Sequence, residues 1–304
     1  MLEQIHTCPI CLSLDIDFFL ETKDFSVSQE VFILSQCKFC SFVFTNPRPD
    51  EKSIGRYYES SKYISHSNTK KGVVNRLYQI VRSFSLRNKL NLISKYAGSD
   101  KTILDIGCGT GAFLNHCKNH GWIASGYEPN KNAREVALNE YGLVLHENMN
   151  FEHFSPESYQ IITLWHVLEH VHHLRKKIED VSYLLKSKGK VLIALPNINS
   201  YDSLHYKKSW AAFDVPRHLY HFSAQNIKDL FRQYNFNPIA SFPMKYDSYY
   251  VSILSEKYKQ KSFPLIRGMY SGLKSNFLAA NNPEKYSSVI YVFEKASLTS
   301  SIKI

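Results

Sequence analysis

Residues 101–121 read KTILDIGCGTGAFLNHCKNHG, and this stretch decides the fold. TILDI at 102–106 is a short run of aliphatic and β-branched residues, which predicts a strand buried in a parallel sheet. Three alternating glycines follow, and residues 112–120 then predict a helix. Glycines at such a turn let the backbone approach a ligand without a Cβ atom in the way. A lone glycine loop is a weak signal, so its surroundings decide what it binds.

The next segment, WIASGYEPN at 122–130, predicts a second strand with Glu128 at its end. Glu128 comes 21 residues after Gly107. An acidic residue at that distance is placed to accept hydrogen bonds from both ribose hydroxyls of a nucleoside. The glycine loop and Glu128 together therefore predict a cofactor that contains a nucleoside.

DIGCGTG at 105–111, followed by Glu128, resembles the class I S-adenosylmethionine-dependent methyltransferases. The resemblance extends from about Lys101 to Pro243 and implies a seven-stranded, doubly wound (Rossmann-like) α/β sheet that binds S-adenosyl-L-methionine. The cofactor-binding residues that it implies are Asp105, Gly107, Cys108, Gly109, Gly111, Glu128, Pro129, Asn148, Met149 and Trp165. With its cysteine-rich N-terminus, the chain resembles a bacterial group of these enzymes that contains zinc-ribbon members. Several relatives in that group act on sugars or small secondary metabolites.

Two CxxC pairs near the N-terminus predict a structural zinc site. The pairs are formed by Cys8 and Cys11 and by Cys37 and Cys40, with 25 residues between them. Two such knuckles brought together offer four thiolates in a tetrahedron, which suits structural zinc. The intervening residues hold strand-like runs, as a zinc ribbon requires, although four cysteines without a metal remain the alternative.

The chain divides into three predicted parts. Residues 1–50 form a zinc-ribbon-like module, 51–98 a mainly helical connector or cap, and 99–304 the methyltransferase domain. Within the last part, 246–287 are predicted as a helical insertion between the final two strands, since they exceed an ordinary hairpin loop. The insertion is either a lid over the substrate pocket, as the resemblance implies, or a packing or dimer helix.

Residues 166–170 read HVLEH, the H-x-x-E-H pattern of the inverted zinc metalloproteases. That site needs both histidines on one helix, whereas IITLW at 161–165 predicts a strand that ends at His166. We therefore expect no protease site. Ligands of open α/β sheets bind outside the carboxyl ends of the strands, so His166 is a candidate catalytic base. A role as a hydrogen-bonded pocket wall is equally open.

DVPRHLYHFS at 214–223 follows the fifth predicted strand and is expected at the same edge of the sheet. His218 is a second catalytic candidate there. Arg217 either holds an anionic substrate group or pairs with Asp214. Glu169 and His170 match a segment that binds a divalent ion in ubiquinone-pathway O-methyltransferases; the alternative is that they fix the start of a helix.

Composition and charge bound the partners. Lys and Arg number 37 against 27 Asp and Glu, a formal net charge of +10, which is compatible with nucleic acid, an anionic membrane surface or a phosphorylated substrate. The basic residues are scattered, which disfavours nucleic acid. The N-terminal residues MLEQIHTCPI lack the features of a signal peptide, and apolar runs such as VLIALP at 191–196 are too short to span a bilayer. We expect a cytoplasmic protein with reduced cysteines.

The sequence thus predicts an S-adenosylmethionine-dependent methyltransferase that acts on a small hydroxylated molecule, such as a sugar, a glycan unit or a secondary metabolite. The alternatives are an RNA or protein methyltransferase and a non-catalytic module that binds the cofactor or a glycan. The acceptor atom and the oligomeric state are not determined by the sequence, and a homodimer is left open.

Overall fold

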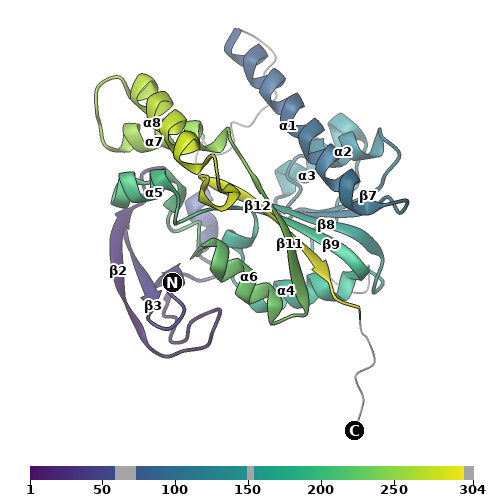
Figure 1. Ribbon diagram of the computed structural model, residues 1–304, viewed down its shortest axis with the longest axis horizontal. Helices are drawn as coiled ribbons and strands as arrows, with labels where there is room; N and C mark the ends of the chain where they lie inside the picture. Colours follow the sequence, from purple (N-terminus) through teal and green to yellow (C-terminus); the bar gives the residue numbers. More distant parts are fainter. Residues whose placement is uncertain (59–72, 149–153, 298–304) are drawn as a thin grey trace.

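A six-stranded mixed sheet forms the centre of the computed structural model (Figure 1). The structure describes residues 1–58, 73–148 and 154–297, with side chains in the first helix from residue 83 onward. The strand order is β11-β12-β9-β8-β6-β7, in which β6 to β9 are parallel and β12 is antiparallel to both of its neighbours, β9 and β11. The strands are β6 (Thr102–Ile106), β7 (Ile123–Tyr127), β8 (Tyr159–Trp165), β9 (Leu185–Pro196), β11 (Phe236–Pro243) and β12 (Ser288–Lys295).

The predicted doubly wound, Rossmann-like sheet is confirmed, but the described residues give it six strands instead of seven. The place of the seventh strand, beside β7, is taken by a single parallel bridge between Tyr127 and His146. His146 N–H donates to the Gly126 carbonyl at 2.9 Å, and Glu128 N–H donates to the His146 carbonyl at 2.9 Å. Val144, two residues earlier, is 85% exposed.

Helices cover both faces of the sheet because the strand side chains alternate between them. Ile103 and Ile161 pack in a cluster with residues of α1 (Val73–Ala97) and α2 (Ala112–Lys118). The next residues along the same strands, Leu104 and Ile162, point to the opposite face and pack with residues of α4 (Leu174–Leu184) and α6 (Ala224–Arg232). A further helix, α3 (Lys131–Tyr141), follows β7. Strands buried on both faces explain the continuous apolar runs in the sequence.

The N-terminal region forms a small sheet that includes a strand from the methyltransferase domain. Strands β2 (Ile16–Lys23), β3 (Val31–Cys37) and β4 (Val43–Thr45) are antiparallel, and β10 (Tyr220–His221) pairs with β4. Two short strands, β1 (Leu2–Glu3) and β5 (Arg48–Pro49), pair separately. Since β10 lies more than 170 residues after β4, the predicted 1–50 module shares its sheet with the loop that carries His218.

Between β11 and β12 the chain forms a pair of helices, α7 (Asp247–Tyr258) and α8 (Pro264–Ala279), which lie side by side in Figure 1. Glycines allow their close approach: a Cβ atom on Gly268 would lie 2.5 Å from the Ile253 Cα atom, and one on Gly272 would lie 2.8 Å from the Tyr249 Cα atom. Among the described residues, no helix combines the length and the apolar character that crossing a membrane requires. Shorter helical segments are α5 (Tyr201–Tyr206), η1 (Ile54–Tyr58), η3 (Leu168–His170), η4 (Lys207–Ser209), η5 (Ala211–Phe213) and η6 (Pro283–Lys285).

Candidate active site and metal sites

The glycine loop joins β6 to α2 and lies next to the end of β8. Gly107 and Gly109 have φ angles of 70° and 55°, a left-handed conformation that favours glycine. A Cβ atom on Gly107 would lie 2.5 Å from the Cγ2 atom of Val167, so only glycine fits there. Gly109 faces open space, since no heavy atom of the described residues lies within 4 Å of the position that a Cβ atom would take. The loop therefore packs on one side and leaves its tip free to approach a ligand.

Glu128 links this loop to the end of β7. Its Oε2 atom accepts a hydrogen bond from Gly109 N–H at 2.9 Å, and its Oε1 atom accepts one from Asn130 N–H at 2.9 Å. Only 8% of the residue is exposed. Each carboxylate oxygen can accept a second hydrogen bond, so Glu128 keeps the capacity to bind ribose hydroxyls while the backbone holds it in place.

Asp105 lies at the base of the loop, with 2% of its surface exposed. Burial raises the pKa of its carboxyl to about 7, although a hydrogen bond from Thr163 opposes this change. The Thr163 hydroxyl donates to Oδ1 of Asp105 at 2.6 Å. Thr163 stands on β8 directly beside Asp105 in the parallel register. Asp105 is predicted from the sequence, whereas its partner Thr163 is revealed only by the pairing of β6 with β8.

The other predicted cofactor residues surround the loop in different ways. Gly111 precedes α2 with a φ angle of 74°, and the Pro129 carbonyl accepts a hydrogen bond from Arg134. Cys108 packs behind the loop against Leu114, Ala137 and Leu143, so its backbone rather than its thiol faces the loop. Asn148 follows the His146 bridge, whereas Met149 lies outside the described residues.

Trp165 ends β8 and forms an aromatic corner with Phe113, the two rings being 5.7 Å apart and nearly perpendicular. The Lys89 ammonium lies 4.4 Å from the centroid of the Trp165 ring. Burial lowers the pKa of Lys89, while the charge of Asp105 opposes the change. Lys89 was missed by sequence reasoning because nothing in the helical pattern of α1 distinguishes a lysine that turns toward the sheet.

His166 lies directly after β8 with a φ angle of 56°, and its side chain is 34% exposed. Its Nδ1 atom lies 3.4 Å from Glu169 Oε1, and its Nε2 atom lies 3.3 Å from Oδ2 of Asp247, the first residue of α7. Burial lowers the pKa of His166, but the two carboxylates outweigh burial and raise it to about 10. The imidazole is thus held as a cation between two anions.

Glu169, His170 and His218 form a second group at this edge, in which one ligand atom from each lies within 4.8 Å of the others. Nδ1 of His170 contacts the Arg217 carbonyl at 3.0 Å, and Nδ1 of His218 contacts the Ala212 carbonyl at 2.9 Å. A carbonyl can only accept, so both Nδ1 atoms carry protons, and Nε2 of such a ring is an acceptor whenever the ring is neutral. Burial lowers the pKa of His170 to about 4, which keeps its ring neutral.

The buried carboxylate of Glu169 accepts no hydrogen bond from the described residues and has only its ion pair with His166. Two imidazoles and a carboxylate are donors that a divalent ion accepts. Glu169 belongs to η3, a short 3-10 helix, and α4 begins only at Leu174. The helical geometry that a metalloprotease site needs is therefore missing from 166–170.

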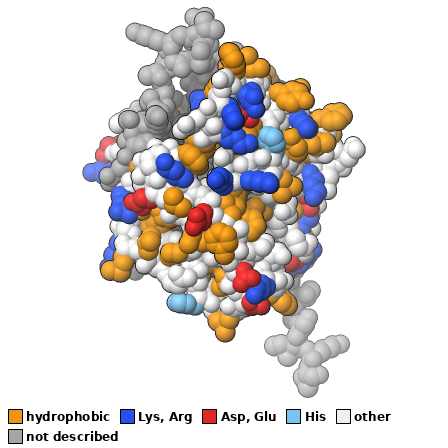
Figure 2. Space-filling view, turned by 90° about the vertical axis from the view of Figure 1, so that its left-hand side faces the viewer, with side chains coloured by type: hydrophobic (Ala, Val, Ile, Leu, Met, Phe, Trp, Pro, Cys, Tyr) orange, Lys and Arg blue, Asp and Glu red, His pale blue; other side chains and the backbone are white. Residues whose placement is uncertain are grey.

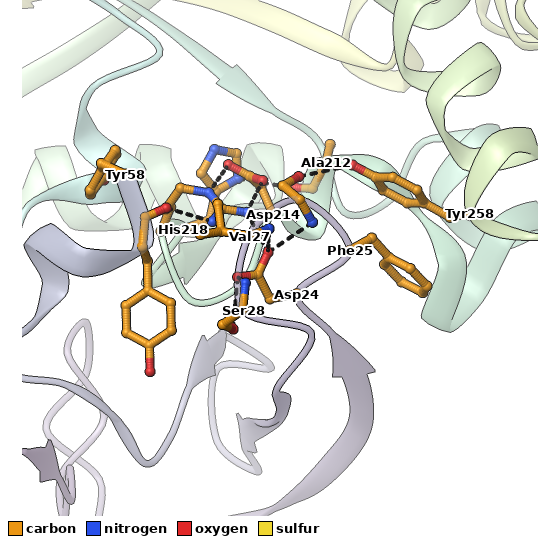
Figure 3. A network of polar contacts seen from close by, with 12 residues as sticks. Asp24, Phe25, Val27, Ser28, Tyr58, Ala212, Asp214, His218 and Tyr258 are labelled. Atoms are coloured by element: carbon orange, nitrogen blue, oxygen red, sulfur yellow. Dashed lines mark hydrogen bonds and ion pairs between the residues drawn. The ribbon is translucent and has the colours of Figure 1, made fainter. Parts of the chain in front are cut away.

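Arg217 joins the N-terminal sheet to the loop at 214–223 that carries His218. Figure 3 shows its two carboxylate partners, Asp24 and Asp214. Its Nη2 atom donates to Asp24 at 2.9 Å and to Asp214 at 2.7 Å. Its Nη1 atom donates to the Tyr57 carbonyl at 2.8 Å, and only 1% of the residue is exposed. Of the two roles open in the sequence, pairing with Asp214 is the one observed, because a buried and fully engaged guanidinium is not accessible to a substrate.

The four N-terminal cysteines lie together, and their Sγ atoms are all within 4.8 Å of one another. The Sγ atoms of Cys8 and Cys40 are 3.5 Å apart, as are those of Cys11 and Cys37. Sulfurs that bind one zinc ion at about 2.3 Å in a tetrahedron are separated by about 3.8 Å. Both knuckles also end alike, since the residue after each second cysteine, Leu12 or Ser41, has a positive φ angle. The donor set and spacing fit zinc.

Comparison with known families agrees with this geometry. A family described as a methyltransferase domain matches residues 78–241, more than half of the chain. The chain belongs to this methyltransferase family. The match includes the glycine loop, Glu128 and the whole of 166–218, whereas Asp247, which contacts His166, lies outside it. The sequence-based assignment to the class I S-adenosylmethionine-dependent methyltransferases is confirmed.

Curated relatives include ubiquinone biosynthesis O-methyltransferases from Yersinia pestis and Yersinia pseudotuberculosis. Each is 31% identical over 133 residues, which make up 40% of this methyltransferase chain and 51% of the relative. The chain thus spans about half the length of the curated relatives it matches.

Solved structures of methyltransferases share the fold. Phosphoethanolamine N-methyltransferase 2 of Haemonchus contortus has a TM-score of 0.52 at 17% identity, covering 93% of this chain and 68% of that one. Geranyl diphosphate C-methyltransferase of Streptomyces coelicolor has a TM-score of 0.50 at 13% identity, covering 81% of this chain and 90% of that one. At these identities the likeness concerns the fold alone.

Proposed function

We propose that this chain is an S-adenosylmethionine-dependent methyltransferase that acts on a hydroxyl group of a small molecule. The observation that carries the proposal is the hydrogen bond from Gly109 N–H to Glu128 Oε2 at 2.9 Å. It holds an acidic side chain at the open tip of the glycine loop, where a ribose can reach both. S-adenosylmethionine supplies a methyl group that is already activated on a sulfonium.

The residues of the chain would bind and orient rather than perform difficult chemistry. Gly107, Gly109 and Gly111 would admit the cofactor to the backbone, and Glu128 would accept hydrogen bonds from the ribose. Trp165 and Phe113 offer a wall that excludes water at the end of β8. Asp105, which is tied to Thr163, supports the loop from below.

His166 is proposed to take the proton of the acceptor hydroxyl. It lies at the same sheet edge as the glycine loop, because Val167, the next residue, is the neighbour that a Gly107 Cβ atom would strike. A neutral imidazole is required for this step, so the flanking carboxylates set the pH at which it occurs. His218, which groups with Glu169 and His170, is proposed as a second catalytic residue of the same site.

The acceptor is proposed to be a small hydroxylated molecule, a sugar, a glycan unit or a secondary metabolite. The likeness to ubiquinone biosynthesis O-methyltransferases supports transfer to oxygen. Asp247 brings the α7–α8 insertion into contact with His166, which supports a role of the insertion as a lid over the acceptor. The four-cysteine site is proposed to hold structural zinc, since the four sulfurs leave no open coordination position.

The test combines binding with turnover. Calorimetry should show S-adenosylhomocysteine binding, and S-adenosylmethionine with a panel of sugars and phenols should yield a methylated product. Methylation of RNA or protein alone would favour the macromolecular alternative. Cofactor binding without turnover on any acceptor would favour a non-catalytic module, and absence of cofactor binding by the folded protein would refute the proposal.

A further inference from the structure

The outer face of α8 carries apolar side chains that no other part of the described chain covers. Their exposed fractions run from 47% for Met269 to 78% for Phe277. The exposed apolar residues in and directly before the helix are Phe263, Leu265, Ile266, Met269, Tyr270, Leu273, Phe277 and Leu278. The opposite face, with Gly268, Gly272 and Ser275, is buried. A continuous exposed apolar face of this kind marks an interaction surface rather than ordinary surface composition.

Basic residues surround this face. Residues 245–285 contain seven Lys or Arg and three Asp or Glu. The three carboxylates are engaged: Asp247 with His166, Glu256 with Arg267, and Glu284 with Lys228. Lys245, Lys257, Lys261, Lys274 and Lys285 are exposed. The charge that the helix pair presents to its surroundings is therefore positive. Figure 2 shows hydrophobic side chains next to Lys and Arg side chains in its upper half.

We propose that the α7–α8 pair docks this chain on an anionic lipid bilayer, with the outer face of α8 lying in the interface. A helix with an apolar face bordered by Lys and Arg, too short to span, lies in the plane of a membrane surface. Arg267 and Lys274 are seven residues apart and follow one edge of the apolar face. Arg267 is paired with Glu256, whereas Lys274 can reach lipid headgroups while the apolar residues enter the acyl boundary.

Charge decides between this occupant and a second copy of the chain. A symmetric dimer through α8 would bring the exposed Lys261 and Lys274 of one copy toward the same residues of the other. No free carboxylate of the helix pair offsets this repulsion, because Glu256 is buried against Arg267 and the other two are paired elsewhere. An anionic headgroup layer neutralises the same charges. The homodimer left open by the sequence stays a prediction and is the competing outcome of the test.

Co-sedimentation of the whole protein with vesicles tests the proposal. We expect binding to vesicles of phosphatidylcholine with 30–40% phosphatidylglycerol (roughly the anionic content that gives a strong surface potential) and little binding to phosphatidylcholine alone. The double variant Ile266→Glu/Tyr270→Glu should lower the partition coefficient about tenfold or more, because two apolar anchors are replaced by anions. Lys261→Gln/Lys274→Gln should lower it about fivefold per lysine.

Matched controls carry the same changes elsewhere. Ile123→Glu/Val144→Glu alters two residues that are 72% and 85% exposed at the β7 edge, and Lys101→Gln/Lys118→Gln removes two exposed lysines from the α2 side. Both should bind vesicles like the unaltered protein. The melting temperature measured by circular dichroism should be unchanged in all four variants, since every altered side chain is exposed. Lys274 also lies over the ring of Tyr201, a contact of small energy at an exposed site.

Three results would overturn the proposal. The first is no vesicle binding by the unaltered protein, and the second is equal binding to both lipid compositions. The third is self-association in sedimentation velocity without lipid that the Ile266→Glu/Tyr270→Glu variant abolishes, which assigns the face to a second copy.

Discussion

The Nε2 atom of His166 lies 3.3 Å from Oδ2 of Asp247, although the two residues are 81 positions apart in the sequence. His166 ends a central strand, whereas Asp247 begins the helix pair inserted near the C-terminus. The contact makes the insertion part of the candidate site. It also surrounds the imidazole with negative charge, because Glu169 lies on the other ring nitrogen.

Replacing His166 tests its proposed role as a base. We expect His166→Ala to lower turnover by roughly 10²- to 10⁴-fold while S-adenosylhomocysteine affinity changes little, since a base acts only as the hydroxyl loses its proton. Steady-state rates and calorimetry measure the two effects. His173→Ala is the control, because His173 is 73% exposed and pairs only with Glu51. A small loss of turnover together with weaker binding would make His166 a wall residue instead.

Asp247 should set the pH dependence of the reaction. With the pKa of His166 raised to about 10, its neutral form is scarce at pH 7, so the rate should rise with pH until about pH 10. Asp247→Asn removes one of the carboxylates that raise this pKa and should move the rise to lower pH. Profiles of kcat for both proteins check this. Identical profiles would show that another group limits the rate.

The tip of the glycine loop should be essential for cofactor binding. Gly109→Val places a side chain in the open space above the loop and should abolish S-adenosylhomocysteine binding in calorimetry. Gly121→Val is a matched control, since Gly121 also has a positive φ angle and open space but lies after α2. Both variants carry a backbone strain of about 1–2 kcal/mol. Undiminished binding by Gly109→Val would place the cofactor elsewhere.

About one zinc ion per chain should copurify with the protein. Elemental analysis should find it in the unaltered protein and in Cys117→Ser, but not in Cys11→Ser/Cys37→Ser, which removes one sulfur from each knuckle. An ion that remains after the double substitution would point to Glu169, His170 and His218 as a second site. Fully reduced protein without any zinc would contradict the predicted ribbon.

The buried ion pairs of Arg217 should stabilise the junction between the N-terminal sheet and the methyltransferase domain. Arg217→Ala leaves the carboxylates of Asp24 and Asp214 without their cation and should lower the free energy of unfolding by about 3–5 kcal/mol. Arg232→Ala breaks an exposed pair with Asp229 and should cost about 0–1 kcal/mol. Urea denaturation measures both. Equal small losses would mean that the junction contributes little.

The sequence alone determined the features that depend on neighbouring residues. TILDI and the glycines that follow it predict a buried strand and a turn because strand propensity and left-handed φ angles are local properties. The position of Glu128 could be predicted from its spacing, since only one helix and one strand separate it from the glycine loop. His166 could be placed at a strand end, and not within a helix, from the apolar run before it.

Only the tertiary structure decided which distant groups meet. Nothing local to Asp247 or Lys89 shows that each contacts a residue at the end of β8, and nothing local to Arg217 shows that it reaches Asp24, because those contacts follow from how helices and strands pack. The same holds for the seventh strand, which within the described residues is a single bridge at His146, and for β10, which joins the N-terminal sheet. Sequence patterns encode periodicity along the chain, whereas charge pairs, shared sheets and the uncovered face of α8 depend on packing between segments far apart in it.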